Sequence, residues 1–274
     1  VAAALVWLRW DYRVLERYRY VIALAGLGLL VLPRLPGIGE QVNGAYLGVR
    51  VGSISFQPAE LAKLAIVVFL ASYLRDTRQV LVQGARRVAG VTIPPLKHFG
   101  PVLVVWGAAM FMLVVIRDLG SSLMFFGGFL ALLYVATNRL SFVTIGLGMF
   151  ALGAWFFSST VAHVHDRVEI WLDPFKPSVV DDKGYQIAQS LFAQADGGVL
   201  GQGFGQALLE LPGGQTLLPA PHTDLIYSVI TDELGLVGAC GVIVVYLLIA
   251  ERGFRIATLA RDSFSKLLAT GLTA

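Results

Sequence analysis

The amino-acid sequence predicts an all-α, polytopic integral membrane protein, a helical bundle with one large extracytoplasmic loop. Hydrophobic residues make up 56% of the 274 residues and charged residues only 14%, whereas soluble globular proteins carry about 25% charged residues. The apolar residues recur in long continuous blocks rather than in alternation with polar ones. Continuous blocks favour membrane-spanning helices over a barrel.

Six apolar blocks are predicted to form the spans: residues 20–32, 61–74, 99–116, 121–137, 141–161 and 225–250. A span needs about 20 residues. The opening ten residues are too few to cross a bilayer, and the apolar stretch from Phe264 stops at Ala274. We therefore expect residues 1–274 to form a single transmembrane domain that continues at both ends in the natural protein.

The distribution of Arg and Lys predicts the orientation of the spans, because basic residues collect in cytoplasmic loops. Such residues lie before the first block, between the second and third, at residue 139 and after the last. The intervening segments, residues 33–59, 117–118 and 163–223, are therefore placed on the outer face. Residues 163–223 form the large loop, with seven acidic and three basic residues. The net charge of +3 follows from topology and does not indicate nucleic-acid binding.

Two short stretches at the outer face contain charged residues with more than one interpretation. In FQPAELAKL, Glu60 suits a helix N-terminus, and Lys63 on the same face either pairs with it or serves a site as a cation. In RDLGSSL, Asp118 can cap the following helix. Arg117 beside it is an interfacial anchor or a phosphate ligand.

The loop 163–223 contains weaker patterns. Two histidines two residues apart, in HVHD, indicate zinc only weakly. The glycines of GGVLGQGFG have no strand before them, so a flexible turn at the membrane surface is favoured over a nucleotide site. The stretch YQIAQSLF predicts an amphipathic segment along the interface. Outside the loop, Cys240 lies inside an apolar block and is expected to be buried.

The stretch LPAPHTDLIYSVITDELG brings three carboxylates to the last span. Thr223 or Asp224 could cap that helix, or Asp224 could be a site residue open to the outer surface. Asp232 is expected about 12 Å deeper along the helix. Glu233 should face roughly away from Asp224 and contact a neighbouring helix.

Six strings together resemble the SEDS family of membrane proteins, which includes RodA, FtsW and SpoVE. They are FQPAELAKL, RDLGSSL, RVEIWLDP, GYQIAQSL, GGVLGQGFG and LPAPHTDLIYSVITDELG, and their order spans almost the whole chain. Two positions depart from the family pattern. Ala59 stands where serine is usual, and Ser55 stands where a basic residue is common. Part of the usual cationic lining is therefore either missing or supplied by Arg50.

The resemblance implies a multi-pass protein of the bacterial cytoplasmic membrane that polymerises lipid II into peptidoglycan, for cell shape or cell division, with a class B penicillin-binding protein as partner. It implies that Asp224 is the catalytic residue and a ligand of a divalent cation, Mg²⁺ or Mn²⁺. It also matches Glu60, Lys63 and Asp118 to positions that the family treats as functional. We expect these three residues to bind substrate together with Arg117, Arg167 and His222, which lie in the matching strings. Two alternatives remain open: a transporter of the lipid-linked precursor, in which intramembrane charges line a path, and a non-catalytic scaffold.

Overall fold

The computed structural model describes most of the chain, in two compact units. The described residues are 12–42, 45–51, 54–83, 86–88, 91–93, 96–115, 119–207, 209–211 and 215–274. Unit 1 comprises residues 1–147 and 250–274, and unit 2 comprises residues 148–249. Each unit has its own arrangement of helices and is described by itself.

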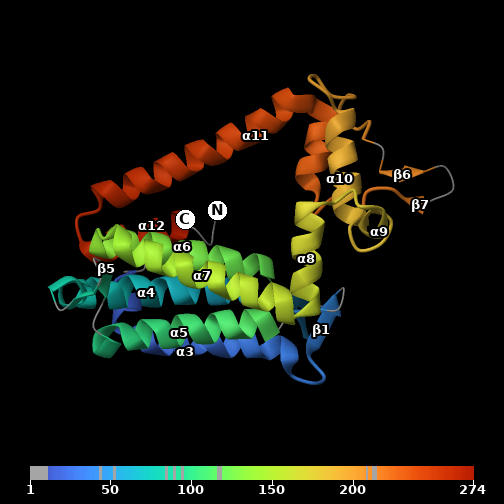
Figure 1. Cartoon of the computed structure of the whole chain (residues 1–274). Coiled ribbons are helices and arrows are strands. Elements are labelled where there is room, and N and C mark those ends of the chain that lie inside the picture. The colour runs from blue at the N-terminus through green and yellow to red at the C-terminus, as the bar shows by residue number, and fades with distance from the viewer. Residues whose placement is uncertain are drawn as a thin grey trace. The chain divides into compact units, whose positions relative to one another are not determined.

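The prediction of an all-α fold is confirmed, because helices make up most of the described chain (Figure 1). The helices of unit 1 are α2 (Val14–Arg17), α3 (Arg19–Val31), η1 (Leu32–Arg34), α4 (Pro58–Gln83), α5 (Leu96–Val115), α6 (Leu119–Thr137), and α12 (Ser263–Thr273). The helices of unit 2 are α8 (Ala162–Leu172), α9 (Pro177–Val180) and α10 (Tyr185–Asp196). Two helices run from one unit into the other: α7 (Leu140–Thr160) and α11 (Ile226–Leu259).

The strands are short and antiparallel. β1 (Gly39–Val42), β2 (Ala45–Val51) and β3 (Ile54–Phe56) form a sheet in that order, directly before α4. Two hairpins pair β4 (Arg86–Val88) with β5 (Val91–Ile93), and β6 (Glu210–Leu211) with β7 (Gln215–Thr216).

The core of unit 1 lies between helices that run side by side (Figure 1). Helix α4 packs against α3, α6 and α12, and the fully buried side chains of this core include Leu30, Phe69, Leu132 and Phe264, one from each of these four helices. Large apolar side chains exclude voids and contribute most of the packing energy. The amphipathic α12 is thereby tied to the bundle.

The six predicted apolar blocks all coincide with helices. Among the described residues, three of these helices are long and apolar enough to cross a membrane. Their apolar segments are Gly120–Thr137, Leu140–Thr160 and Ile226–Leu259. Helix α3, at 13 residues, is shorter than the roughly 20 residues that a span requires. The helices of residues 162–196 replace much of the expected loop 163–223.

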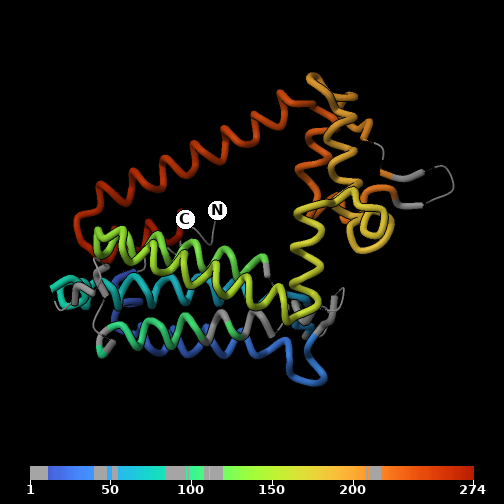
Figure 2. The backbone as a smooth tube through the Cα atoms, viewed as in Figure 1, coloured from blue at the N-terminus to red at the C-terminus, as the bar shows by residue number. Residues whose placement is uncertain are grey.

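Two predictions about the last block are wrong. Residues 225–250 do not form one continuous helix, because Gly235 interrupts α11 with φ 64° and ψ −163°. Figure 2 shows the tube turning sharply where the two helical pieces of α11 meet beside α10. Cys240, which was expected to be buried, is exposed.

Candidate functional site

Asp224 lies in a tight turn that directly precedes α11. Ala220 adopts φ 51°, and its carbonyl accepts hydrogen bonds from the backbone N–H groups of Thr223 and Leu225, each at 3.2 Å. Pro219 and a second proline at position 221 flank Ala220, and proline restricts the backbone on both of its sides. The turn therefore holds the His-Thr-Asp motif in a defined conformation.

The helix-cap interpretation of this motif is not supported. Helix α11 begins at Ile226, two residues after Asp224, and the Thr223 hydroxyl donates to the Ala220 carbonyl at 3.5 Å rather than to the helix. The Asp224 side chain is exposed and makes no hydrogen bond or ion pair with another described residue. His222 is exposed as well. The carboxylate is thus open to a ligand instead of being used to start the helix.

Buried polar contacts fix the first turn of α11 against α10. The hydroxyls of Ser190 and Ser228 lie 2.6 Å apart, and the Gln194 side-chain amide donates to both at 3.2 Å. Ser228 is 2% exposed. Because buried polar groups are costly unless hydrogen-bonded, this cluster specifies how α10 meets α11 one turn after Asp224.

The interruption of α11 is closed by the glycine-rich segment 197–203. The backbone N–H groups of Gln202 and Gly203 donate to the carbonyls of Asp232 and Glu233 at 2.9 and 3.0 Å. On the far side of Gly235, two further backbone bonds run from residues 236 and 237 to the carbonyls of residues 198 and 199, at 2.9 and 3.3 Å. The carbonyls of residues 232 and 233 and the N–H groups of residues 236 and 237 are therefore hydrogen-bonded in spite of the break. A membrane protein requires such pairing of its backbone groups.

The glycine-rich segment forms turns at residues 197–200, as predicted, and its glycines also allow the backbone to approach α11 closely. Gly201 has φ +85°, and a Cβ atom there would lie 2.6 Å from the Leu234 nitrogen and closer still to the Glu233 carbonyl. Asp232, predicted deep in a continuous span, is 5% exposed at this junction. Glu233 is half-buried, and its backbone carbonyl accepts a hydrogen bond from the N–H group of Gly203.

An ion-pair network joins α8 to the start of α10. The Lys183 ammonium donates to Asp166 and Glu169 at 2.6 Å each, and Lys176 donates to Glu169 at 2.7 Å. The hydrogen bonds from Lys176 and Lys183 lower the pKa of Glu169 from 4.5 to about 2. Those from Asp166 and Glu169 raise the pKa of Lys183. Arg167, on the same helix, is exposed and forms no ion pair with a described residue.

The predicted residues of unit 1 lie near the start of α4. Lys63 and Glu60 form an ion pair at 2.7 Å, one helical turn apart, with the Lys63 side chain 21% exposed. Arg50 on β2 is directly opposite Ser55 on β3. This register places the guanidinium at the position where the family commonly carries a basic residue, because paired residues of adjacent strands are neighbours.

The predicted substrate residues thus divide between the units. Glu60 and Lys63 contact each other in unit 1, while Arg167, His222 and Asp224 belong to unit 2, where no hydrogen bond or ion pair joins them. Arg117 and Asp118 lie outside the described residues. The Ser190–Ser228 contact, Lys183 and Gly235 were not predicted.

The described residues do not form a metal centre by themselves. Within the described part of the chain, no three His, Cys, Asp or Glu side chains gather closely enough to hold an ion. His163 and His165 lie on α8 at positions i and i+2, which face different sides of a helix. A single carboxylate fits Mg²⁺, which commonly binds one or two carboxylates together with substrate phosphates and water.

Comparisons with known proteins agree with the sequence resemblance. The family described as "Cell cycle protein", of FtsW, RodA and SpoVE, matches residues 1–274. The chain is 39% identical over 264 residues to peptidoglycan glycosyltransferase RodA of Mycobacterium tuberculosis, covering 96% of this chain and 55% of that protein. It is 33% identical to a probable peptidoglycan glycosyltransferase FtsW of Geobacter metallireducens, over 99% of this chain and 68% of that one.

The fold is also shared with solved structures. A chain from the structure described as "Structural coordination of polymerization and crosslinking by a peptidoglycan synthase complex" superposes with a TM-score of 0.72 and 24% identity, over 98% of this chain and 70% of that chain. The present chain spans about half the length, 55%, of the mycobacterial relative.

Proposed function

Because this chain belongs to the cell cycle protein family of FtsW, RodA and SpoVE, we propose that the protein is a peptidoglycan glycosyltransferase. It joins lipid II units into glycan strands at the outer face of the bacterial cytoplasmic membrane. Relatives that are 33% to 39% identical and carry this activity in their names support the proposal.

The observation that carries the proposal is the exposed Asp224 carboxylate, held by the turn at Ala220 and unused by helix α11. In the reaction, the 4-hydroxyl oxygen of the acceptor sugar attacks C1 of the donor glycan. The bond from C1 to the undecaprenyl diphosphate breaks, and the diphosphate leaves with the electron pair. Asp224 accepts the hydroxyl proton or, alternatively, binds a divalent cation against the diphosphate.

A divalent cation, Mg²⁺ or Mn²⁺, would neutralise negative charge on the leaving diphosphate when bound. Asp224 is its proposed protein ligand. We also propose that Lys63 binds substrate phosphate and that Arg167 and His222 contact substrate, on the strength of the resemblance. The partial burial of Lys63 and its pairing with Glu60 support a fixed ammonium position.

The distribution of charge favours an enzyme over a transporter of the lipid-linked precursor. A path through the bilayer requires ionisable groups at depth on several helices. The windows Gly120–Thr137 of α6 and Leu140–Thr160 of α7 contain no Asp, Glu, Lys or Arg. The third window, Ile226–Leu259 of α11, contains Asp232 and Glu233 beside the break at Gly235, so ionisable groups at depth are confined to one of the three helices.

A class B penicillin-binding protein is the proposed partner. The similar solved structure comes from a peptidoglycan synthase complex that couples polymerization to crosslinking.

The test is incubation of the purified protein with lipid II and Mn²⁺ or Mg²⁺, with and without a class B penicillin-binding protein, and separation of the products by length. Glycan ladders that depend on the protein support the proposal. Intact lipid II under all these conditions, together with lipid II movement across a vesicle membrane, would instead identify a transporter.

A further inference from the structure

Unit 1 has a pocket of about 390 Å³ where the junction of α2 and α3 meets the later part of α4. Its lining is mainly charged: Arg13, Glu16, Arg17, Arg19, Tyr20, Arg75 and Asp76. None of these residues has been assigned to the glycosyltransferase site. The pocket therefore needs a separate explanation.

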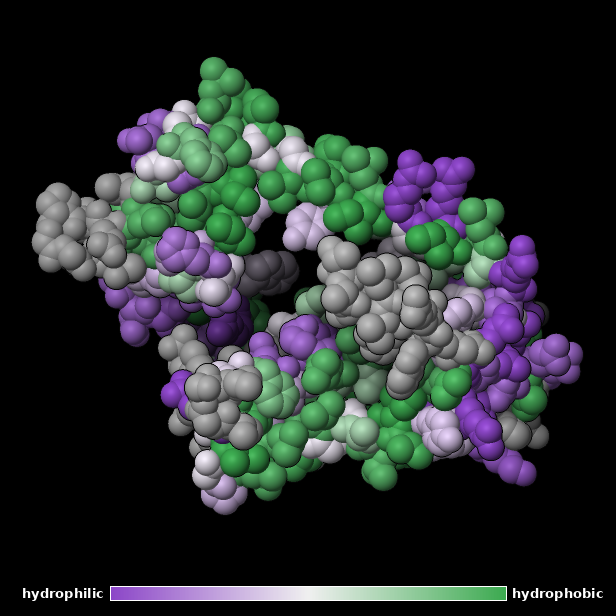
Figure 3. Space-filling model, turned by 180° about the vertical axis from the view of Figure 1, so that it is seen from behind, coloured by the Kyte–Doolittle hydropathy of each residue, from purple (hydrophilic) through white to green (hydrophobic). Residues whose placement is uncertain are grey.

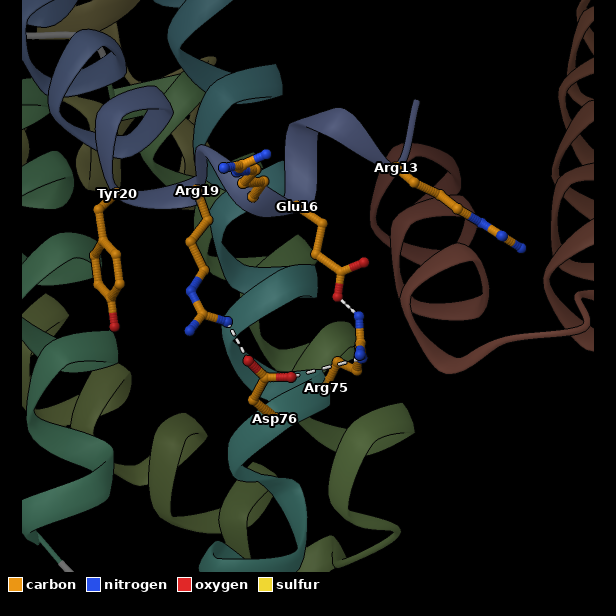
Figure 4. Close-up of a pocket in the computed structure, with 7 residues that line it drawn as sticks. Arg13, Glu16, Arg19, Tyr20, Arg75 and Asp76 are labelled. Atoms are coloured by element: carbon orange, nitrogen blue, oxygen red, sulfur yellow. Dashed lines mark hydrogen bonds and ion pairs between the residues drawn. The ribbon is translucent and has the colours of Figure 1, made fainter. Parts of the chain in front are cut away.

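A row of ion pairs holds two of the arginines in place. Figure 4 shows this row running from Arg19 to Asp76, then to Arg75, and from Arg75 to Glu16. The Arg19 guanidinium also donates to the Ser72 carbonyl at 3.4 Å and lies 5.2 Å from the centre of an aromatic ring, that of Tyr20. These contacts fix the side chains that form the wall of the pocket.

The charges of the pocket do not cancel. Arg13 points away from the row in Figure 4 and pairs with Asp262 at 3.6 Å. Four arginines then face three carboxylates, those of Glu16, Asp76 and Asp262. Arg17 is exposed and, within the described part of the chain, has no carboxylate partner. Among these described residues one positive charge remains, which equals the single negative charge of a phosphodiester.

Aromatic and charged residues place the pocket at the level of lipid headgroups. Tyr12, Tyr18 and Tyr20 are 43%, 51% and 56% exposed around it, and exposed tyrosines mark membrane interfaces. Helix α4 changes from apolar to charged at Arg75, after the buried residues 66–74. Figure 3 shows hydrophilic side chains gathered along one edge of unit 1, beside hydrophobic surface over the helices.

We infer that this pocket binds the phosphodiester of an anionic phospholipid, with Arg17 as the principal ligand. Guanidinium groups match phosphate oxygens through paired donors. Basic pockets between transmembrane helices are recognised sites for anionic headgroups. The positive-inside distribution of arginine places the pocket at the cytoplasmic leaflet, the opposite face from the proposed polymerisation reaction.

Lipid affinity of the purified protein tests this inference independently of polymerase activity. The protein in neutral detergent is titrated with short-chain phosphatidylglycerol or with the matching phosphatidylcholine, and bound lipid is counted by native mass spectrometry. Phosphatidylglycerol should bind more tightly. Arg17→Ala should weaken its binding about fivefold, since one arginine near a lipid surface contributes about 1 kcal/mol, and Arg17→Lys should retain most of it.

Arg139→Ala is the matched control, because Arg139 is exposed in the turn between α6 and α7, outside the pocket, and is assigned to the same face. It should bind phosphatidylglycerol as the wild type does. Equal losses in Arg17→Ala and Arg139→Ala, or equal affinity for the two lipids, would overturn the inference. Binding of glycerol phosphate as tight as that of phosphatidylglycerol would assign the pocket to a soluble phosphate and overturn the assignment to a lipid.

Discussion

The docking of the glycine segment on the break in α11 depends on the absence of a side chain at Gly201. A Cβ atom at this position would overlap the backbone at Glu233 and Leu234, which no side-chain rotation can relieve, and alanine would also be strained at φ +85°. The strain costs about 1 to 2 kcal/mol. Separation of residues 197–203 from α11 would also remove the backbone hydrogen bonds from Gln202 and Gly203 to the carbonyls of residues 232 and 233. Each of these bonds contributes about 1 kcal/mol.

Gly201→Ala should therefore destabilise this contact by about 3 kcal/mol. A free-energy change of that size corresponds to about a 100-fold rise in local opening. Hydrogen–deuterium exchange followed by mass spectrometry measures it directly, in peptides that contain the amides of residues 202–203 and 236–237. Exchange in α4 should not change.

Gly205→Ala is the control for backbone strain alone. Gly205 has φ +73° and no atom within 4 Å of the position of a Cβ, so alanine there costs only about 1 to 2 kcal/mol and removes no bond across the break. Equal exchange in the two variants would refute the close-approach explanation. Rapid exchange of the four amides in the wild-type protein would refute the contact itself.

Three further outcomes are expected. Since the pKa of Glu169 falls from 4.5 to about 2, its ionised form stabilises the fold above about pH 4.5. That contribution to stability should be lost as the pH falls through about 2. Lys183→Met should make this loss of stability smaller, and near-ultraviolet circular dichroism at decreasing pH follows it in both proteins. The Asp262 side chain accepts from the Ser265 N–H at 2.9 Å, so Asp262→Ala should lower the unfolding free energy by about 1 kcal/mol and Asp262→Asn by less, in thermal unfolding. A cysteine at Asp181 should react with an impermeant thiol reagent in intact cells; reaction only after lysis would reverse the topology.

The helical framework could be predicted because its environment is lipid. A bilayer requires long apolar helices, so hydropathy alone locates them: residues 141–161 were predicted where α7 covers Leu140–Thr160, and residues 121–137 where α6 covers Leu119–Thr137. The ion pair of Glu60 and Lys63 followed from helical spacing and is confirmed at 2.7 Å.

The features that were missed depend on contacts between distant residues. In the sequence, nothing distinguishes Gly235 from other glycines in apolar blocks. The helix break at Gly235 is stabilised by backbone hydrogen bonds to residues 198–199 and from residues 202–203, which the sequence does not show. Lys183 stabilises α8 from 14 residues beyond Glu169. The close pair in SLFAQ, Ser190 and Gln194 on one helical face, was the available signal for the Ser228 contact.

The turn at Asp224 was only partly predicted. The prolines at positions 219 and 221 restrict the backbone on both sides of Ala220, and the Ala220 carbonyl accepts the two hydrogen bonds that close the turn. The choice between a helix cap and a ligand-binding carboxylate at Asp224 could not be made from the sequence, because the two differ by a shift of one residue in the start of α11. Helix boundaries differ by one or two residues between definitions. The Asp224 side chain makes no hydrogen bond to a described residue, and this decides against the cap.

The yield of glycan from lipid II by Asp224→Asn protein, compared with wild-type protein and with Asp181→Asn, tests the central claim most directly. Asp181 is another exposed aspartate of unit 2, so its variant controls for the loss of one negative charge. Asparagine cannot accept the hydroxyl proton and is a poorer cation ligand, so Asp224→Asn should lower the polymerisation rate by a factor of about 10² to 10⁴. Asp181→Asn should polymerise normally. Near-normal glycan chains from a folded Asp224→Asn protein would contradict the assignment of Asp224 to the reaction.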